Sequence, residues 1–377
     1  MKKFISILLA TLILTSLLTI ISASAKVKTY RNNDYIYCFV DDGVQILHYV
    51  GKDTKVTVPS EIEGRKVVKL GVDIDDKYYM EMDALSPNAG FYHHSDITEV
   101  ILPNSIKEIG SGSFSQCKNL KKVTLGNGIT EIPSSLFYYC PKLRTVEIPF
   151  GVEEIGDLAF SNCPNLKDIR LPSSVTEIDC DAFSGTGLTK FYFGKNVKYI
   201  GIDVFEDTPI KKITVSEENT KYSAENGVLY NKDKTKLYYY PSNKKEETFK
   251  VPKAVEKINV SAFSYNKNLK SLVVSKGVKK IGYNAFFRCT NLSKVTFKTT
   301  KEVKIGYCAF YNCKSLKKVT IPKNVKKIGA RAFGFYVKKG KDGEYKLKKI
   351  QGFTIKGKSG SQSEKYAKQN GFKFVVV

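Results

Sequence analysis

Apolar residues recur along the chain in a unit that can be written L-x-x-V-x-L-P-x-x-V-x-x-I-G-x-x-A-F-x-x-C-x-x. The alternation of apolar and polar residues in L-x-x-V-x-L predicts a half-buried β-strand. V-x-x-I predicts a second short strand, and A-F-x-x-C has the near-helical spacing of one turn packed against a core. Copies of the unit begin at Ile97, Leu120, Leu143, Leu166, Leu188, Ile210, Leu269, Leu292 and Leu316.

These units must stack, because a single copy cannot bury both of its faces. Parallel strands of stacked copies lie about 4.8 Å apart, so equivalent residues form columns along the molecule. The copies follow one another every 22 to 24 residues, except for one step of 59 residues after Ile210. The sequence therefore predicts an elongated solenoid with a single shared core rather than several globular domains.

Five cysteines occupy the same place in the unit, three residues after its Phe. Free Cys packs as a small buried hydrophobe, and Thr186, Thr208 and Asn266 replace it in other copies. We therefore interpret this Cys column as a structural ladder of buried thiols. Disulfides between adjacent units are the alternative, since the strand spacing lies within bridging range. The column consists of Cys117, Cys140, Cys163, Cys289 and Cys313.

With its L-P step, I-G corner and A-F-x-x-C turn, the unit resembles the BspA-type leucine-rich repeat of bacteria, over about residues 35–377. The resemblance implies a leucine-rich-repeat solenoid of the α/β, horseshoe-like class, with stacked 22–24-residue units, parallel β-sheets and short helical turns. It also implies a secreted or surface-displayed protein associated with adhesion to host proteins or to other cells. It does not indicate a particular ligand.

Four segments divide the chain. Residues 1–25 combine Lys2 and Lys3, an apolar run and an Ala-Ser-Ala site, which predicts a signal peptide, with a membrane anchor as the alternative. Residues 26–71 form a predicted N-terminal capping unit with a hairpin at 41–43. Residues 72–350 form the solenoid, in which 210–268 make a longer unit with a hairpin. Residues 351–377 form a C-terminal capping unit, and the mature chain has no predicted transmembrane segment.

The sequence predicts no enzyme, cofactor or metal site. The three His residues lie near the N-terminal end without a nucleophile motif, and there is no Gly-rich phosphate loop. The segment 72–96 could suggest a cation site, but its spacing does not match an EF-hand, and a long loop in a degenerate repeat explains it. The potential ligands there are Asp73, Asp75, Asp76, His93 and His94.

Charge is polarised from end to end. The whole chain has a net charge of +24, yet residues 26–187 hold 17 Lys/Arg against 23 Asp/Glu, whereas residues 188–377 hold 42 against 14. On the exposed side of the second strand, the paired residues change from Glu153-Glu154 to Lys279-Lys280 and Lys326-Lys327. This basic half suggests an anionic partner, although Lys residues that only confer solubility would give the same pattern.

Outward positions of the first strand, together with the Tyr-rich hairpin, form the candidate ligand face. The third and fifth residues of the unit flank the inward Val and should point to solvent. The tyrosines of the hairpin serve either for packing or as contact anchors. The candidate face consists of Lys122, Arg170, Lys190, Tyr192, Lys212, Lys294, Lys318, Tyr230, Tyr238 and Tyr240.

These features predict an exported, non-enzymatic binding protein that adheres to extracellular proteins, glycans or other cells through its solenoid surface. The basic half would contact an anionic cell-wall polymer or a sulfated glycan. Nucleic acid would bind such a surface nonspecifically, but export argues against it as the intended partner. A structural spacer or matrix protein without a specific ligand is the alternative. The predicted location is extracellular and surface-associated.

Overall fold

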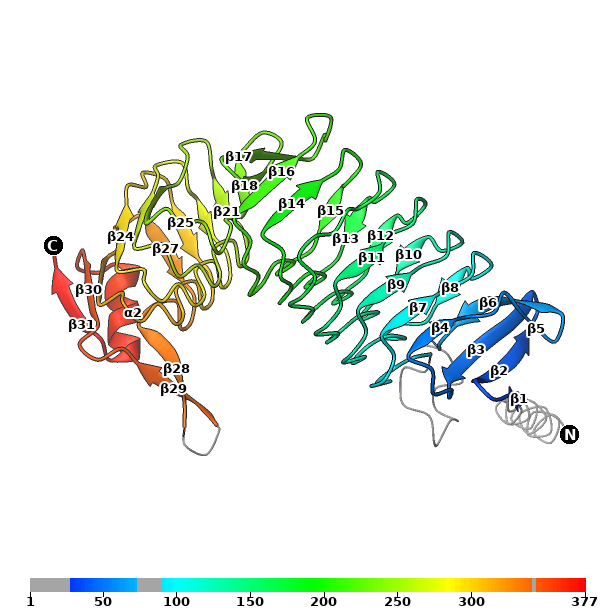
Figure 1. Cartoon of the computed structure of the whole chain (residues 1–377). Helices are drawn as coiled ribbons and strands as arrows, with labels where there is room; N and C mark the ends of the chain where they lie inside the picture. Colours follow the sequence, from blue (N-terminus) through cyan, green and yellow to red (C-terminus); the bar gives the residue numbers. More distant parts are fainter. Residues whose placement is uncertain (1–27, 73–89, 341–343) are drawn as a thin grey trace, which may run out of the picture.

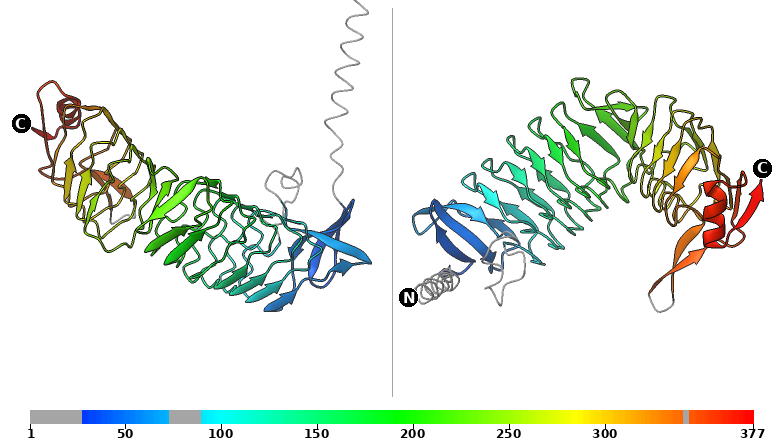
Figure 2. Two further views of the ribbon diagram at one scale, coloured as in Figure 1. Left: turned by 90° about the horizontal axis from the view of Figure 1, so that it is seen from above. Right: turned by 180° about the vertical axis from the view of Figure 1, so that it is seen from behind.

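The computed structural model describes residues 28–72, 90–340 and 344–377. The predicted signal peptide at 1–25, and Asp73, Asp75 and Asp76, lie outside these residues. The chain winds into an arched stack of short turns, with the strands β1 (Thr29–Arg31) and β31 (Lys373–Val376) at opposite ends of the arch (Figure 1). Figure 2 shows from two further sides that the strands lie across the long axis, as the repeat predicts.

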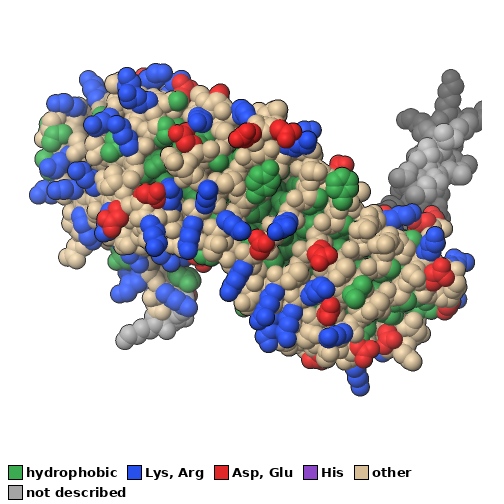
Figure 3. All heavy atoms as spheres, turned by 45° about the horizontal axis from the view of Figure 1, so that its top comes forward, with side chains coloured by type: hydrophobic (Ala, Val, Ile, Leu, Met, Phe, Trp, Pro, Cys, Tyr) green, Lys and Arg blue, Asp and Glu red, His purple; other side chains and the backbone are tan. Residues whose placement is uncertain are grey.

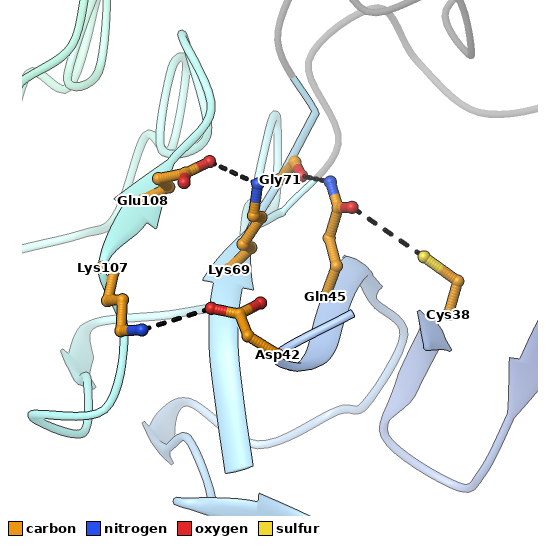
Figure 4. A network of polar contacts seen from close by, with 7 residues as sticks. All are labelled: Cys38, Asp42, Gln45, Lys69, Gly71, Lys107 and Glu108. Carbon is orange, nitrogen blue, oxygen red and sulfur yellow. Dashed lines mark hydrogen bonds and ion pairs between the residues drawn. The ribbon is translucent and has the colours of Figure 1, made fainter. Parts of the chain in front are cut away.

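An antiparallel hairpin closes the N-terminal end. The strands β1, β2 and β3 pair antiparallel. On the other side of β3, β6 pairs with it in parallel, and β6 in turn pairs in parallel with β8 of the first turns. Polar contacts tie this cap to the stack (Figure 4): Lys69 lies 2.6 Å from Glu108, and Lys107 lies 3.2 Å from Asp42. The elements are β1 (Thr29–Arg31), β2 (Tyr35–Val40), β3 (Gly43–Tyr49), β5 (Glu61–Ile62), β6 (Arg65–Leu70) and β8 (Glu108–Ile109).

Parallel strands from the L-x-x-V-x-L segments line one side of the stack, which we call the first sheet. Equivalent residues pair in register, as Val100 does with Val123 and Val123 with Val146. Backbone pairing runs in four groups, because some turns are too irregular to continue the ladder. The strands are β4 (Lys55–Thr57), β7 (Glu99–Ile101), β9 (Lys122–Thr124), β11 (Thr145–Glu147), β14 (Lys190–Phe193), β16 (Lys212–Val215), β20 (Thr248–Lys250), β22 (Ser271–Val274), β24 (Lys294–Phe297), β26 (Lys318–Thr320), β30 (Thr354–Gly357) and β31 (Lys373–Val376).

The V-x-x-I segments form a second row of parallel strands, the second sheet. It also runs in groups, one of four strands in the N-terminal half and one in the C-terminal half that begins with the long unit. In that long unit β17 (Tyr222–Glu225), β18 (Val228–Asn231) and β19 (Lys236–Tyr239) pair antiparallel, which gives the hairpin that the sequence predicts. The other strands are β10 (Glu131–Ile132), β12 (Glu154–Ile155), β13 (Glu177–Ile178), β15 (Tyr199–Ile200), β21 (Lys257–Ile258), β23 (Lys280–Ile281), β25 (Val303–Ile305) and β27 (Val325–Ile328).

The predicted short helical turns are wrong. In the described part of the chain, the one helix is α2 (Gln362–Asn370), and the A-F-x-x-C segments form non-helical turns. Each turn is flanked by left-handed residues, such as Leu158 at φ 57° and Asn162 at φ 60°. This backbone directs alternate amide groups to the next unit, so that Phe160 N donates to Ala182 O at 2.8 Å instead of to its own turn. A helix would forfeit these bonds between units.

The core is built from stacked rings. The Phe residues of successive turns are fully buried and lie 5.2 to 5.5 Å apart between ring centroids from Phe91 to Phe183. A second stack of 4.6 to 4.7 Å separations runs from Tyr240 to Phe333. The second stack begins inside the long unit, where the ring centroids of Phe205 and Tyr239 lie 5.4 Å apart. The buried residues therefore form two large clusters that follow one another along the solenoid and meet at the long unit.

The C-terminal end closes with α2 and the strands β30 and β31. Tyr366 of α2 exchanges two hydrogen bonds of 2.9 Å with the backbone of Phe333, which anchors the helix on the last turn of the stack. Gly371 ends the helix in a left-handed conformation at φ 63°, as a C-cap glycine commonly does. Between the last full turn and this cap, β28 (Phe335–Lys339) and β29 (Tyr345–Lys349) form an antiparallel hairpin that projects from the stack (Figure 1).

Candidate ligand-binding surface

The first sheet directs the predicted side chains to solvent. Lys122, Arg170, Lys190, Lys212, Lys294 and Lys318 are all exposed, and Tyr192 is 58% exposed. The physical reason is the pleat, which turns the neighbours of each inward residue outward. Exposure alone does not make a site, so the arrangement of these side chains along the sheet decides what they can bind together.

The basic residues of the first sheet do not form a continuous row. Lys190 pairs directly with Lys212. In the next group of strands, Lys294 pairs with Ser271, whose other neighbour is Thr248. Lys122 lies 3.6 Å from Glu99, which partly neutralises it. The first sheet therefore offers separated basic spots rather than one basic surface.

The tyrosines of the hairpin are divided between core and surface. Tyr240 is fully buried against Phe263, with the two ring centroids 4.7 Å apart, and Tyr230 is only 3% exposed. These two side chains therefore pack in the core, and their prediction as part of the candidate face is wrong. Tyr238 is half-buried and meets Tyr222 edge to face at 5.3 Å, so part of its ring remains accessible.

The Cys column lies inside the stack. All five thiols are at most 1% exposed, and all eight cysteines are free in the structure. Each column thiol donates a hydrogen bond to the Phe carbonyl of the preceding unit, as Cys163 does to Phe137 at 3.0 Å. Burial raises the pKa of Cys163 well above its usual value, and the neighbouring Cys140 raises it further. These contacts fit a packing role.

A continuous row of lysines lies on the second sheet. One lysine comes from each of five consecutive strands, β19, β21, β23, β25 and β27, and each pairs in register with the next. We call this row the Lys ladder. At about 4.8 Å per strand it spans roughly 19 Å. It consists of Lys236, Lys257, Lys280, Lys304 and Lys327.

Sequence reasoning found only part of this row. It singled out Lys280 and Lys327 but missed Lys236, Lys257 and Lys304. The row can be seen in the sequence, because Lys stands immediately before the inward Ile or Leu of the second strand in each of these units. Lys304 did not align with the other lysines because its unit has one residue fewer between Val and Ile. In the structure, an irregularity between Val303 and Lys304 brings Lys304 into register with Lys327.

The same position is acidic in the N-terminal half. Glu131 pairs with Glu154 and Glu154 with Glu177, and the row ends at Tyr199. Burial raises the pKa of Glu154, and the nearby Asp179 and Glu131 raise it further. The second sheet thus changes sign along its length. In the space-filling view of Figure 3, Lys and Arg side chains gather over the C-terminal half.

Acidic neighbours of the Lys ladder mostly bind other lysines, although Asp233 interacts with Lys236 at the end of the row. Glu256 binds Lys279 at 2.6 Å and Lys301 at 3.7 Å, and Glu302 lies 3.8 Å from Lys326. These carboxylates thus face lysines beside the ladder. Among the ion pairs of the described residues, none includes a ladder lysine.

Two other features are absent from the described ranges. No group of three or more His, Cys, Asp or Glu side chains there is placed to hold a metal ion. No helix there has the length and apolar character needed to cross a membrane. His93 and His94 of the ligand-rich segment are described, and the His94 Nε2 atom lies 3.3 Å from the carbonyl oxygen of Gly51.

Comparison with known proteins agrees with this architecture. Six copies of the BspA type leucine rich repeat region match residues 86–225 and 234–351, which is more than half of the chain. The chain belongs to the BspA-type leucine-rich repeat family. The L-P step, the I-G corner and the Cys column are thus features of BspA-type repeats in this chain. No curated protein matches the sequence.

Two solved structures share the fold of this BspA-type protein along nearly its whole length. A leucine rich cell surface protein of Faecalibacterium prausnitzii A2-165 is 28% identical, covers 89% of each chain and superposes with a TM-score of 0.65. The pneumococcal vaccine antigen PcpA is 21% identical, covers 93% of this chain and 98% of its own, and has a TM-score of 0.62. At that identity the likeness to PcpA concerns the fold alone.

Proposed function

We propose that this BspA-type protein is exported and acts at the cell surface as a non-enzymatic adhesion protein whose basic C-terminal half contacts an anionic partner. Family membership supports a binding or adhesion role. The similar structure from Faecalibacterium prausnitzii belongs to a protein described as a cell surface protein. The leader at 1–25 supports export, because its charged start, apolar run and small-residue site are those of a signal peptide.

The observation that carries this proposal is the uneven charge of an exposed, repetitive surface. Residues 188–377 hold 42 Lys/Arg against 14 Asp/Glu. Solvent-exposed charges interact over about one Debye length, so a basic face attracts anionic polymers strongly at low salt and weakly at high salt. A protein or glycan of the extracellular space, or an anionic cell-wall polymer, has the required chemistry.

Cell fractionation with a salt wash tests the proposal. Cells that produce the protein are separated from medium at low ionic strength and then washed in roughly 1 M NaCl, where the Debye length falls to about 3 Å. We expect the protein with the cells before the wash and in the supernatant after it. Protein found in the medium at low ionic strength would contradict surface association. Retention that salt does not weaken would contradict an electrostatic contact and favour a structural matrix role.

A further inference from the structure

We infer that the Lys ladder and the groove at its N-terminal end form one binding site for a linear anionic polysaccharide that lies along the stacking axis. This inference rests on the proposed binding function and names its site and its partner. The ladder supplies one lysine per turn, and backbone pairing sets the spacing of the Cα atoms from which these side chains extend. A partner with regularly repeated negative groups can therefore contact several lysines at once.

The ladder is energetically unfavourable without such a partner. Like charges directly opposite one another on neighbouring strands repel. Partial burial lowers the pKa of Lys257, and the adjacent Lys280 and Lys236 lower it further. Asp233, which also lines the groove described below, interacts with Lys236 at the end of the row. The carboxylates of Glu256 and Glu302 bind lysines beside the ladder, so the ion pairs of the described residues leave the repulsion among Lys257, Lys280, Lys304 and Lys327 in place. An extended polyanion would relieve it along the whole row.

The groove continues the ladder toward the middle of the molecule. It has a volume of about 460 Å³ and lies where β15 of the N-terminal half meets the hairpin of the long unit. Lys236, the first residue of the ladder, lines it together with Lys198, Lys221 and Tyr238. Lys232, also in its lining, is held in place by hydrogen bonds to the Glu217 and Asn219 carbonyls at 3.0 and 2.6 Å.

The groove favours a sugar polymer over a simple polyphosphate. The groove is open to solvent along its length, and Tyr238 gives it a partly exposed aromatic ring on which a sugar can pack. Exposed tyrosines also follow the corners after β23 and β25, namely Tyr283 and Tyr307, which are 59% and 43% exposed. These two tyrosines come three residues after Lys280 and Lys304, and such a repeat of cation and aromatic ring suits a chain that alternates sugar rings and negative groups.

Nucleic acid fits this arrangement less well. Double-stranded DNA keeps its bases stacked inside the duplex, so it would offer phosphates to the lysines but no accessible ring to Tyr238. Proteins that bind single strands without sequence preference stack successive bases on aromatic rings. Here exposed tyrosines follow only two of the five ladder strands, and Tyr238 adds one more at the end.

Binding of defined polymers to the mature protein tests the inference. The probes are heparin, whose charge is largely sulfate, hyaluronan, whose charge is carboxylate, and single-stranded DNA. One variant changes Lys257, Lys280, Lys304 and Lys327 to Gln. The matched control changes Lys122, Lys190, Lys294 and Lys318 of the first sheet to Gln, which removes the same charge. A third variant carries Arg at the four ladder positions and retains the charge.

We expect the Gln ladder variant to bind heparin about tenfold more weakly, since each exposed charge contributes little alone. The affinity of the first-sheet control for heparin should fall less than about twofold, and the Arg variant should bind heparin as tightly as the wild type. Tyr238→Ser should lower the affinity for heparin about threefold. An unchanged affinity would show that the groove is not part of the binding site. Binding of heparin alone would identify sulfate as the recognised group, and binding of hyaluronan as well would identify carboxylate as sufficient.

Equal losses in the ladder variant and the first-sheet control would overturn the inference, because total charge would then explain binding. Tighter binding of DNA than of either glycan would overturn the choice of polysaccharide. Circular dichroism should show that the Gln variant remains folded, since the substitution removes repulsion. If cells retain the Gln variant as well as the wild type, the ladder site is wrong while the adhesion proposal stands. If cells fail to retain the wild type, the adhesion proposal itself fails.

Discussion

Substitution of Cys163 measures what the buried thiol column contributes to stability. The side chain is fully buried, and its thiol donates to the Phe137 carbonyl at 3.0 Å. Cys163→Ala removes about one buried methylene equivalent, or about 0.8 kcal/mol, and one hydrogen bond of about 1 kcal/mol. The expected loss is therefore about 2 kcal/mol. Cys163→Ser retains a donor but places a hydroxyl in an apolar stack, and it should cost about 1–3 kcal/mol.

Urea unfolding followed by far-UV circular dichroism gives these stability differences. Maleimide labelling followed by mass spectrometry gives a second readout, because the thiolate is the reactive form. Burial raises the pKa of Cys163 and keeps it protonated. Cys180, which is partly exposed, is the internal control. We expect native protein to label at Cys180 and to label the column only after denaturation.

Two results would refute this reasoning. Native labelling of Cys117, Cys140 and Cys163 as fast as that of Cys180 would show that the column is accessible. Linked peptides with no free thiol in denaturant would show disulfides between adjacent units in place of free thiols. A Cys163→Ala variant as stable as the wild type would also contradict the calculated contribution.

Two further predictions concern buried polar groups near the long unit. Tyr240→Phe should stabilise the C-terminal core by about 1 kcal/mol in urea unfolding, because the Tyr240 hydroxyl is buried without a hydrogen-bond partner in the described structure; a loss of stability would reveal a partner. The Asp181 pKa is raised from 3.8 to about 7 by burial and then by Asp203, Glu206 and Asp157. The folded chain thus holds this proton more tightly, and its stabilising effect is lost as pH rises from about 4 to about 7. Asp181→Asn should therefore raise the urea midpoint more at pH 8 than at pH 4.5, and equal shifts at both values would contradict the assignment.

Much of the fold could be predicted from the sequence, because stacking converts a linear period into columns. The column from Cys117 to Cys313 and the outward side chains of the first sheet follow directly from that period. The predicted C-terminal capping unit contains a helix at Gln362–Asn370 that ends at Gly371, a residue type that commonly stops helices. These features depend on spacing and on local turn residues, both of which a sequence displays.

Other features depend on backbone geometry that hydrophobic spacing does not contain. A helical turn and a turn with left-handed ends place Ala159, Phe160 and Cys163 on the same side, so the pattern could not separate them. The frequent Asn, Asp and Gly at the flanking positions, such as Asn162, were the available signal. The sequence could not show which tyrosines of the hairpin are buried, because a register shift between Leu229 and Tyr230 alters which side chains face the core.

Lysine footprinting of the native protein on its partner tests the central claim most directly. The mature protein is acetylated with and without heparin, and then on intact cells, and the modified lysines are quantified by mass spectrometry. We expect protection of Lys257, Lys280, Lys304 and Lys327, with little change at Lys122 and Lys318 of the first sheet. Uniform protection of all exposed lysines, or protection centred on the first sheet, would contradict the claim.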